Sequence, residues 1–233
     1  MSLEIITFVI LIQISIHRKF ASLQIDNSKI GKTDNHAVSA ILHTMAYALV
    51  KALTEHDYLA QEEHALDKHE FVYSAIYAMA GASERHNTIT GNLFAACHAA
   101  CKGSACRPFM GDMRLRLEGG NIYYYPDVML ICNPQDTNPM FKSLPCLLAE
   151  VSSPSTQGID RREKLAAYLK IATLREYLII SQDEVAVALY QRQDMGQWHQ
   201  TSLGAGESFS LACLPLSLSV DQLYAALLPT PAP

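Results

Sequence analysis

The sequence predicts an α/β fold in which a mixed central β-sheet is flanked by helices. The unbroken apolar run from Leu144 to Val151 is typical of a central strand covered on both faces. An apolar stripe at helical spacing between Glu84 and Cys101 predicts a long helix. Strict alternation over Met113–Leu117, a turn at Glu118–Asn121 and a second β-rich run over Ile122–Cys132 predict an antiparallel hairpin.

Length and composition indicate a single globular core. The chain has 233 residues, of which 49% are hydrophobic and 18% charged, so it lacks the composition of a disordered or fibrous protein. Its formal net charge of −5 excludes nucleic-acid binding through bulk positive charge, so any such contact must be local. The apolar run Leu3–Ile16 is shorter than the about 20 residues of a membrane span, and no positive charge precedes it as in a secretory signal. We therefore expect no membrane partner.

Six cysteines lie mostly among apolar neighbours rather than in the dense framework of a small secreted protein. We therefore expect buried thiols and a cytoplasmic location. Cys97-His98 with Cys101 and Cys106 is a weaker candidate for a zinc site, because the spacing lacks a Cys-x-x-Cys pair. The remaining cysteines are Cys132, Cys146 and Cys213.

The first half of the chain predicts two helices separated by a strand. Thr54 begins a capping pattern for a helix that extends to about Leu66. His69–Met79 alternates in the manner of a strand. The long helix begins near Glu84 and is broken by Lys102-Gly103-Ser104.

The second half predicts one helix, several strands and a closing helix. Asp160 caps the helix, and Glu163 completes a capping-box pattern. Two strands follow as a hairpin, and peripheral strands include Trp198, Phe209 and Leu218. The hairpin strands are Glu176–Ser181 and Val185–Arg192, and the closing helix is Val220–Leu228.

Two acids interrupt apolar strands, Asp127 after Tyr125-Pro126 and Glu150 within Leu147–Val151. Burial of an unpaired charge costs several kcal/mol, so each acid requires a partner. A shared divalent cation is one solution. Strand-end positions in solvent, or a neighbouring arginine for each acid, are the alternative.

Three runs of the sequence resemble a known family. They are HEFVYSAIYAMAGASERHN, YYYPDVMLIC and LLAEVSSPSTQGIDRREKLAAYLKIATLREYLIIS, and together they resemble the Uma-two family of "putative restriction endonucleases" in the PD-(D/E)XK nuclease superfamily. The resemblance extends from about Leu53 to about Tyr224. It implies a restriction-endonuclease-like core over residues 45–228, with residues 1–44 as an accessory extension or mis-assigned leader and residues 229–233 as a tail.

The resemblance implies metal-dependent hydrolysis of phosphodiester bonds, with DNA as the expected partner. Asp127 and Glu150 would bind Mg²⁺, or Mn²⁺ as a substitute, together with the backbone carbonyl of Val151. Glu70 matches a further acidic residue of the family that binds the metal or a metal-bound water. Where the family commonly has a glycine, this chain has Ser74.

The resemblance also supplies a cation and substrate contacts. The superfamily pattern places lysine two residues after the glutamate, where this chain has Ser152, and the family carries its lysine on the following helix, matched here by Lys164. The His86-Asn87 pair matches the family and is an expected substrate contact, with helix-start capping as the alternative. Apart from the resemblance, Arg161 beside the second carboxylate is a candidate contact to DNA, and Tyr168 either donates to a phosphate or packs. A catalytically inactive nucleic-acid-binding or interaction module with the same fold is the alternative function, and a homodimer is an expected assembly.

Overall fold

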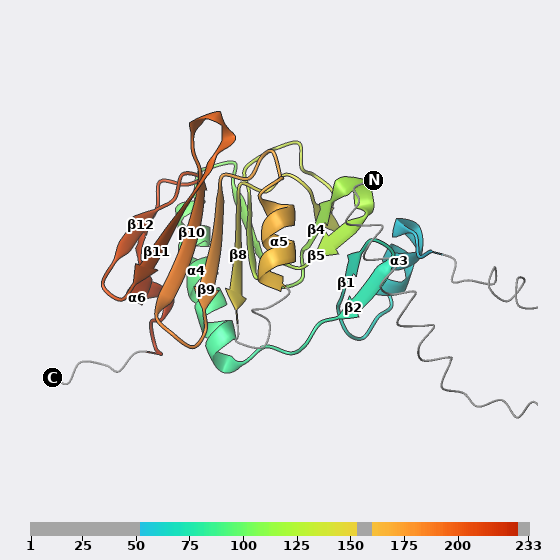
Figure 1. The fold of residues 1–233 in the computed structure, drawn as a ribbon, viewed down its shortest axis with the longest axis horizontal. Coiled ribbons are helices and arrows are strands. Elements are labelled where there is room, and N and C mark those ends of the chain that lie inside the picture. Colours follow the sequence, from blue (N-terminus) through green and yellow to red (C-terminus); the bar gives the residue numbers. More distant parts are fainter. Residues whose placement is uncertain (1–51, 153–159, 228–233) are drawn as a thin grey trace, which may run out of the picture. The chain divides into compact units, whose positions relative to one another are not determined.

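The computed structural model describes residues 52–152 and 160–227 (Figure 1). The extension predicted at residues 1–44 and the tail at 229–233 lie outside the described residues, as does most of the loop after Ser152. Within the described part, no helix is long and apolar enough to cross a membrane.

A six-stranded mixed sheet forms the centre of the fold, with strand order β11-β10-β9-β8-β6-β3. Strands β8 and β9 are parallel, and the other neighbours in this sheet are antiparallel. The central position predicted for Leu144–Val151 is confirmed, since β8 has neighbours on both sides and is mostly buried. The strands are β3 (Arg107–Met110), β6 (Val128–Ile131), β8 (Leu147–Ser152), β9 (Glu176–Ser181), β10 (Ala186–Arg192) and β11 (Trp198–Gly204).

A second mixed sheet of five strands, in the order β2-β1-β5-β4-β7, corrects the prediction of a single central sheet. The β-rich run Ile122–Cys132 is divided between the two sheets at Tyr125-Pro126. Pro126 has no N–H to give to a ladder, so the strand ends there and the chain changes sheets. The strands are β1 (His69–Val72), β2 (Ala75–Ala78), β4 (Arg114–Leu117), β5 (Ile122–Tyr124) and β7 (Phe141–Lys142). A third, two-stranded sheet pairs β12 (Ser208–Ser210) with β13 (Ser217–Ser219).

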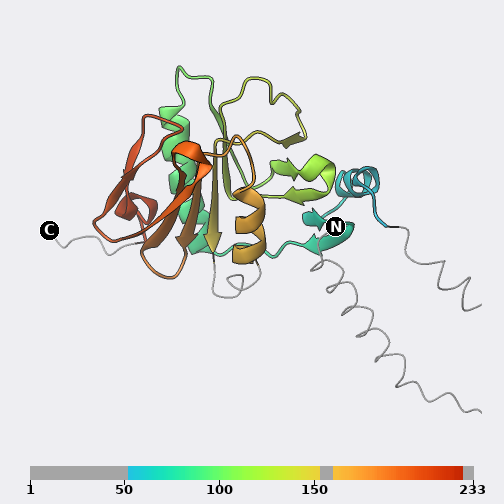
Figure 2. The ribbon, with the colours of Figure 1, turned by 45° about the horizontal axis from the view of Figure 1, so that its top comes forward.

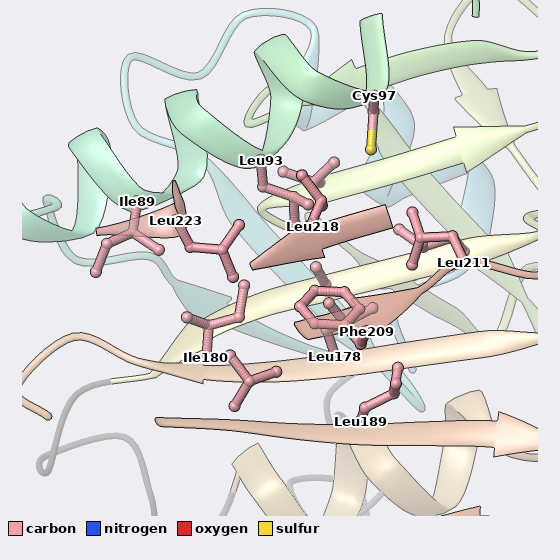
Figure 3. Close-up of a cluster of buried hydrophobic side chains, with 14 of the residues drawn as sticks. Ile89, Leu93, Cys97, Leu178, Ile180, Leu189, Phe209, Leu211, Leu218 and Leu223 are labelled. Atoms are coloured by element: carbon pink, nitrogen blue, oxygen red, sulfur yellow. The ribbon is translucent and has the colours of Figure 1, made fainter. Parts of the chain in front are cut away.

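The two faces of the six-stranded sheet pack into different apolar clusters, as alternation along its strands requires. Val128 and Leu130 of β6 pack with α4 (Glu84–Ala100), through its Ile89 and Leu93 (Figure 3). The intervening residues of β6 pack with Tyr168 of α5 (Asp160–Tyr168) and with the five-stranded sheet. Figure 2 shows α4 and α5 with the strands between them from a second direction. One sheet is therefore buried on both sides.

The hairpin β1–β2 replaces the single strand predicted over His69–Met79. Tyr73 and Ser74 form its two-residue turn, with φ of +47° and +73°. Positive φ at both turn residues matches the strand twist but is costly for residues with a Cβ, so a glycine at the position of Ser74 would fit this turn with less strain.

Both terminal helices of the described region are shorter than predicted. The capping box of Thr54 and Asp57 is confirmed, but α3 ends at Glu62 rather than near Leu66. The carboxylate of Glu62 accepts hydrogen bonds from His69 N, which ties the helix end to β1. The closing helix α6 covers Val220–Leu223 only.

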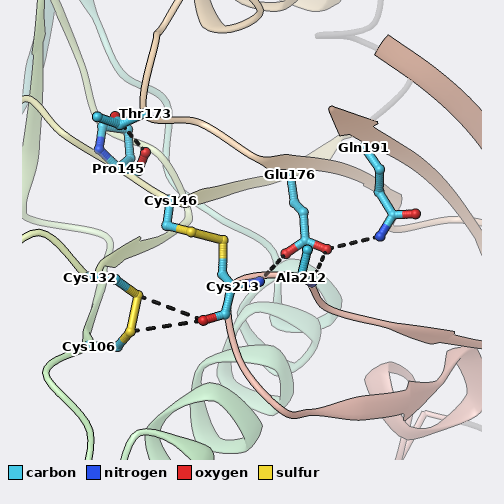
Figure 4. The surroundings of a disulfide bond; sticks show 9 residues. All are labelled: Cys106, Cys132, Pro145, Cys146, Thr173, Glu176, Gln191, Ala212 and Cys213. Carbon is cyan, nitrogen blue, oxygen red and sulfur yellow. Dashed lines mark hydrogen bonds between the residues drawn. A yellow bond between two sulfur atoms is a disulfide. The ribbon is translucent and has the colours of Figure 1, made fainter. Parts of the chain in front are cut away.

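The expectation that all six cysteines are thiols is wrong for four of them. Disulfides join Cys106 to Cys132 and Cys146 to Cys213, and both lie near the fully buried Glu176 and the loop after β12 (Figure 4). The other two cysteines, Cys97 and Cys101, are buried thiols on and just after α4. The cysteines are therefore committed to packing and cross-linking rather than to zinc.

Candidate active site

Asp127 lies at the start of β6, opposite Glu150 on the neighbouring strand. The register pairs Val128 with Ala149, which brings the two acids to corresponding positions on adjacent antiparallel strands. Asp127 Oδ2 accepts a hydrogen bond of 2.7 Å from Val151 N and lies 3.2 Å from His86 Nε2. The contacts fix Asp127 between the central strand and the first turn of α4.

Ser83 explains the position of His86, because its hydroxyl caps α4 by accepting from the backbone N–H of His86. A capped helix start holds the imidazole against Asp127.

Glu150 lies on the α5 face of the central sheet and meets two residues of that helix. Tyr168 OH donates a 2.8 Å hydrogen bond to Glu150 Oε1, and Lys164 Nζ lies 3.5 Å from the same oxygen. Lys164 and Tyr168 are four residues apart, so one helix face presents both side chains. The lysine expected from the helix after β8 does reach this carboxylate.

Glu70 lies on β1 of the five-stranded sheet and contacts the same lysine. Its Oε1 lies 2.7 Å from Lys164 Nζ, and this ion pair joins β1 to α5. The Lys164 ammonium also lies 5.3 Å from the centre of the Tyr124 ring. Two carboxylates from two sheets therefore meet at one ammonium group, with Glu70, Glu150 and Lys164 each less than a sixth exposed, and Asp127 lies opposite Glu150 on the neighbouring strand.

The electrostatics of the site favour protonation. Burial, opposed by Lys164 and assisted by Asp127, raises the pKa of Glu150 from 4.5 to about 7. The hydrogen bond to Asp127 raises the pKa of His86 against the opposing effect of burial. Both groups therefore keep their protons to a higher pH than they would in water.

The donor set fits a weakly held Mg²⁺ better than a preformed cage. In the described part of the chain, no group of three or more His, Cys, Asp and Glu side chains is already arranged around a cation position. The contacts of Asp127 use Oδ2 and those of Glu150 use Oε1, so each keeps a second oxygen for a ligand. Mg²⁺ is commonly held by one or two carboxylates, waters and substrate phosphates, which suits two such oxygens.

The structure brings together most of the residues singled out from the sequence. His86 contacts Asp127, and Lys164 contacts both Glu70 and Glu150. The two groups meet at β8, where the N–H of Val151, the residue after Glu150, donates to Asp127. Val151 contributes an observed N–H bond to Asp127, whereas its carbonyl was expected to act. The Arg161 side chain lies outside the described residues.

Tyr168, considered as a substrate contact, and Ser152, which stands where a lysine was expected, are both buried. Tyr168 is fully buried and its hydroxyl is bonded to Glu150, so it positions that carboxylate. Ser152, where the superfamily pattern places lysine, is only 7% exposed, and Lys164 supplies the cation from α5 instead.

Sequence reasoning missed the Tyr124 ring beside Lys164. An aromatic residue in an apolar strand carries no signal that distinguishes this position from packing. Two open pockets of about 270 and 330 Å³ lie beside Arg116 and beside His98, away from these carboxylates.

Comparisons with known proteins show the family of the chain. Residues 56–223 match the model of the Uma2 family, described as "Putative restriction endonuclease". Two relatives from Synechocystis sp. (strain ATCC 27184 / PCC 6803 / Kazusa) are described as uncharacterized. Protein slr1290 is 34% identical over 176 residues, which cover 75% of this chain and 93% of the relative. Protein sll1609 is 38% identical over 162 residues, which cover 68% and 92%.

A solved structure is also similar. It is described as a putative nuclease belonging to DUF820 from Anabaena variabilis ATCC 29413, with a TM-score of 0.64 and 18% identity. The match covers 75% of this chain and 99% of that one, and it supports the likeness of fold.

Proposed function

Because the chain belongs to the Uma2 family of "putative restriction endonucleases", we propose that it is a metal-dependent DNA endonuclease that hydrolyses phosphodiester bonds. The observation that carries the proposal is the meeting of Glu70 and Glu150 at Lys164, with Asp127 opposite Glu150 and close enough to raise its pKa. Buried acids collected around one lysine are costly for stability, and they cluster where a cation and a charged substrate must be held.

Asp127 and Glu150 are the proposed metal ligands, with the Val151 carbonyl and Glu70 as further oxygen donors. Bound Mg²⁺ would supply Lewis acidity and a water of lowered pKa. The Val151 N–H and the Tyr168 hydroxyl fix the two acids, so that neither carboxylate must reorganise when substrate arrives.

Lys164 is proposed to stabilise the negative charge of the transition state. Its ammonium is held by Glu70 and Glu150, and from that position it donates to a phosphate oxygen on which negative charge develops. His86, with its raised pKa, offers a second N–H donor beside Asp127, and Arg161 is a proposed contact to the DNA backbone.

Cleavage of supercoiled plasmid tests the proposal. The wild-type protein is expected to nick or linearise the plasmid with Mg²⁺ or Mn²⁺ and to be inactive with EDTA. Asp127→Asn and Glu150→Gln are each expected to lower the rate about 100-fold or more. Glu184→Gln, at an exposed position in the turn between β9 and β10, removes the same charge and should retain activity.

Three outcomes would replace the proposal. Equal rates in wild type and variants would assign the cleavage to a contaminant. Metal-independent DNA binding without cleavage would favour the inactive binding module. Neither binding nor cleavage would leave an interaction or accessory protein.

The assembly and location of the enzyme are proposed separately. A homodimer, which would cut both strands, predicts a mass of twice the 25.8 kDa chain in light scattering. The proposed cytoplasmic location conflicts with the two disulfides, because disulfides are rare in a reducing compartment. Folded, active protein after full reduction is the result that a cytoplasmic location requires.

A further inference from the structure

The β1–β2 hairpin exposes an unusual amount of apolar surface beside the candidate site. Seven large apolar side chains are exposed in the described part of the chain, and three of them lie in this hairpin. They are Tyr73, Ile76 and Tyr77, exposed by 60%, 36% and 56%. Clustered exposed apolar side chains commonly mark a binding surface.

Strand register places one of these rings beside the carboxylates. Tyr77 of β2 is the direct partner of Glu70 of β1. Directly opposed residues of an antiparallel pair point to the same face, with Cβ atoms ~5 Å apart. Glu70 reaches Lys164 from that face, so the exposed Tyr77 ring borders the Glu70–Lys164 pair at the edge of the sheet.

The neighbouring exposed residues do not share this placement. Ile76 pairs with the buried Phe71 and points to the opposite face of the hairpin. Tyr73 lies in the turn, and its hydroxyl donates to Glu118. Tyr77 alone among the three therefore has a free ring next to the site's ionic groups.

We propose that the Tyr77 ring is a stacking platform for an unpaired base adjacent to the phosphate held at Lys164. The inference rests on the proposed nuclease function and deepens it, because it names the substrate class as nucleic acid with an unstacked base at the cleavage point. Both faces of a base inside a continuous duplex are covered by the neighbouring bases, so a protein ring cannot stack on it. A base in a gap, a flap or a single strand has an open face on which the ring can stack.

The charge of the protein favours this mode of binding over a purely ionic one. A chain with a net charge of −5 has little general attraction for phosphates, so a stacked base contributes a larger share of the affinity. Addition of a protein strand to the β2 edge is the competing use of this surface. Strand addition would use the backbone of β2 and would not depend on an aromatic ring at position 77.

Binding of labelled oligonucleotides tests the inference independently of cleavage. Fluorescence anisotropy in Ca²⁺ compares a continuous duplex with the same duplex carrying a short single-stranded gap. Wild type should prefer the gapped duplex, and Tyr77→Ala should weaken that binding about 5- to 150-fold with a much smaller effect on the continuous duplex. Tyr77→Phe should stay within about 2-fold of wild type, since it keeps the ring.

Matched variants and kinetics separate stacking from structural damage. Ile76→Ala truncates the adjacent exposed side chain on the opposite face and should bind like wild type. In Mg²⁺, Tyr77→Ala should raise KM for the gapped substrate while kcat changes little, as expected for lost binding to substrate and transition state alike.

Each contrary result overturns a specific claim. Unchanged binding by Tyr77→Ala, or an equal loss in Tyr77→Phe, overturns the stacking inference and leaves the nuclease proposal standing. A ring-dependent preference for the gapped duplex without any cleavage overturns the nuclease proposal and retains the stacking contact. Absence of binding to either oligonucleotide overturns both.

Discussion

Metal binding should depend steeply on pH because Glu150 must lose its proton to act as a ligand. With a pKa of about 7, this carboxyl is ionised in roughly one tenth of molecules at pH 6 and nine tenths at pH 8. The apparent affinity for Mn²⁺ should therefore rise about 10-fold between these values, and binding at pH 7 should release about half a proton from Glu150.

Calorimetric titration measures both quantities. Heats collected at pH 6, 7 and 8, in buffers of different ionisation enthalpy, give the affinity and the number of protons released. The rising limb of the pH–rate profile for plasmid cleavage should have its midpoint near the same pH. Equal affinity at pH 6 and pH 8, or binding without proton release at pH 7, would refute the assignment of Glu150 as a ligand with a raised pKa.

Variants of the helix that faces Glu150 shift this midpoint in a known direction. The Lys164 charge and the Tyr168 hydrogen bond both lower the pKa of Glu150. Lys164→Met and Tyr168→Phe should therefore move the midpoint for metal binding to higher pH. Tyr190→Phe makes the same chemical change in a ring stacked on Tyr177 and should leave the midpoint unchanged.

Three further predictions concern stability. The raised pKa of Glu150 contributes up to about 3 kcal/mol to the free energy of unfolding, which is fully present below pH 4.5 and is lost as pH rises through about 7. In denaturant titrations without metal, the free energy of unfolding of wild type should therefore fall from pH 5 to pH 8 by more than that of Glu150→Gln. Glu176→Ala, which removes the buried acceptor of three hydrogen bonds, should cost about 3 kcal/mol in the same assay. Ser83→Ala, which removes the cap of α4, should cost about 1 kcal/mol, and losses under 0.5 kcal/mol would contradict these bonding roles. Reduction of the disulfides, which span 26 and 67 residues, should remove about 3–4 kcal/mol each, and an unchanged Tm in dithiothreitol would show that they do not constrain the unfolded chain.

The sequence predicted those helices and strands whose bounds depend on neighbouring residues. The capped start of α3, the helix α4, the central strand with Glu150 and the helix with Lys164 follow from caps and apolar periodicity. The hairpin at Tyr73-Ser74 was missed because neither residue is a usual choice for positive φ. The division at Pro126 was missed because apolar residues continue on both sides of it, although a proline is a known limit to a ladder.

The long-range features were beyond sequence patterns. Cysteine pairing depends on which strand ends meet, and residues 146 and 213 are separated by 67 positions. The ion pair of Glu70 with Lys164 depends on the placement of β1 next to β5, in a sheet that was not predicted. The resemblance to the family named both residues, but only the structure shows that Lys164 contacts Glu70 and Glu150 together.

Charge balance relates the carboxylates of the site to the raised pKa values of Glu150 and His86. Three carboxylates and the Lys164 ammonium leave two negative charges when all the acids are ionised. Without a metal, the structure compensates by holding protons, since the pKa values of Glu150 and His86 are both raised. A divalent cation supplies the same two positive charges and makes both protons unnecessary. Proton uptake and metal binding are therefore competing ways to neutralise one site, and the competition is what the calorimetric experiment measures.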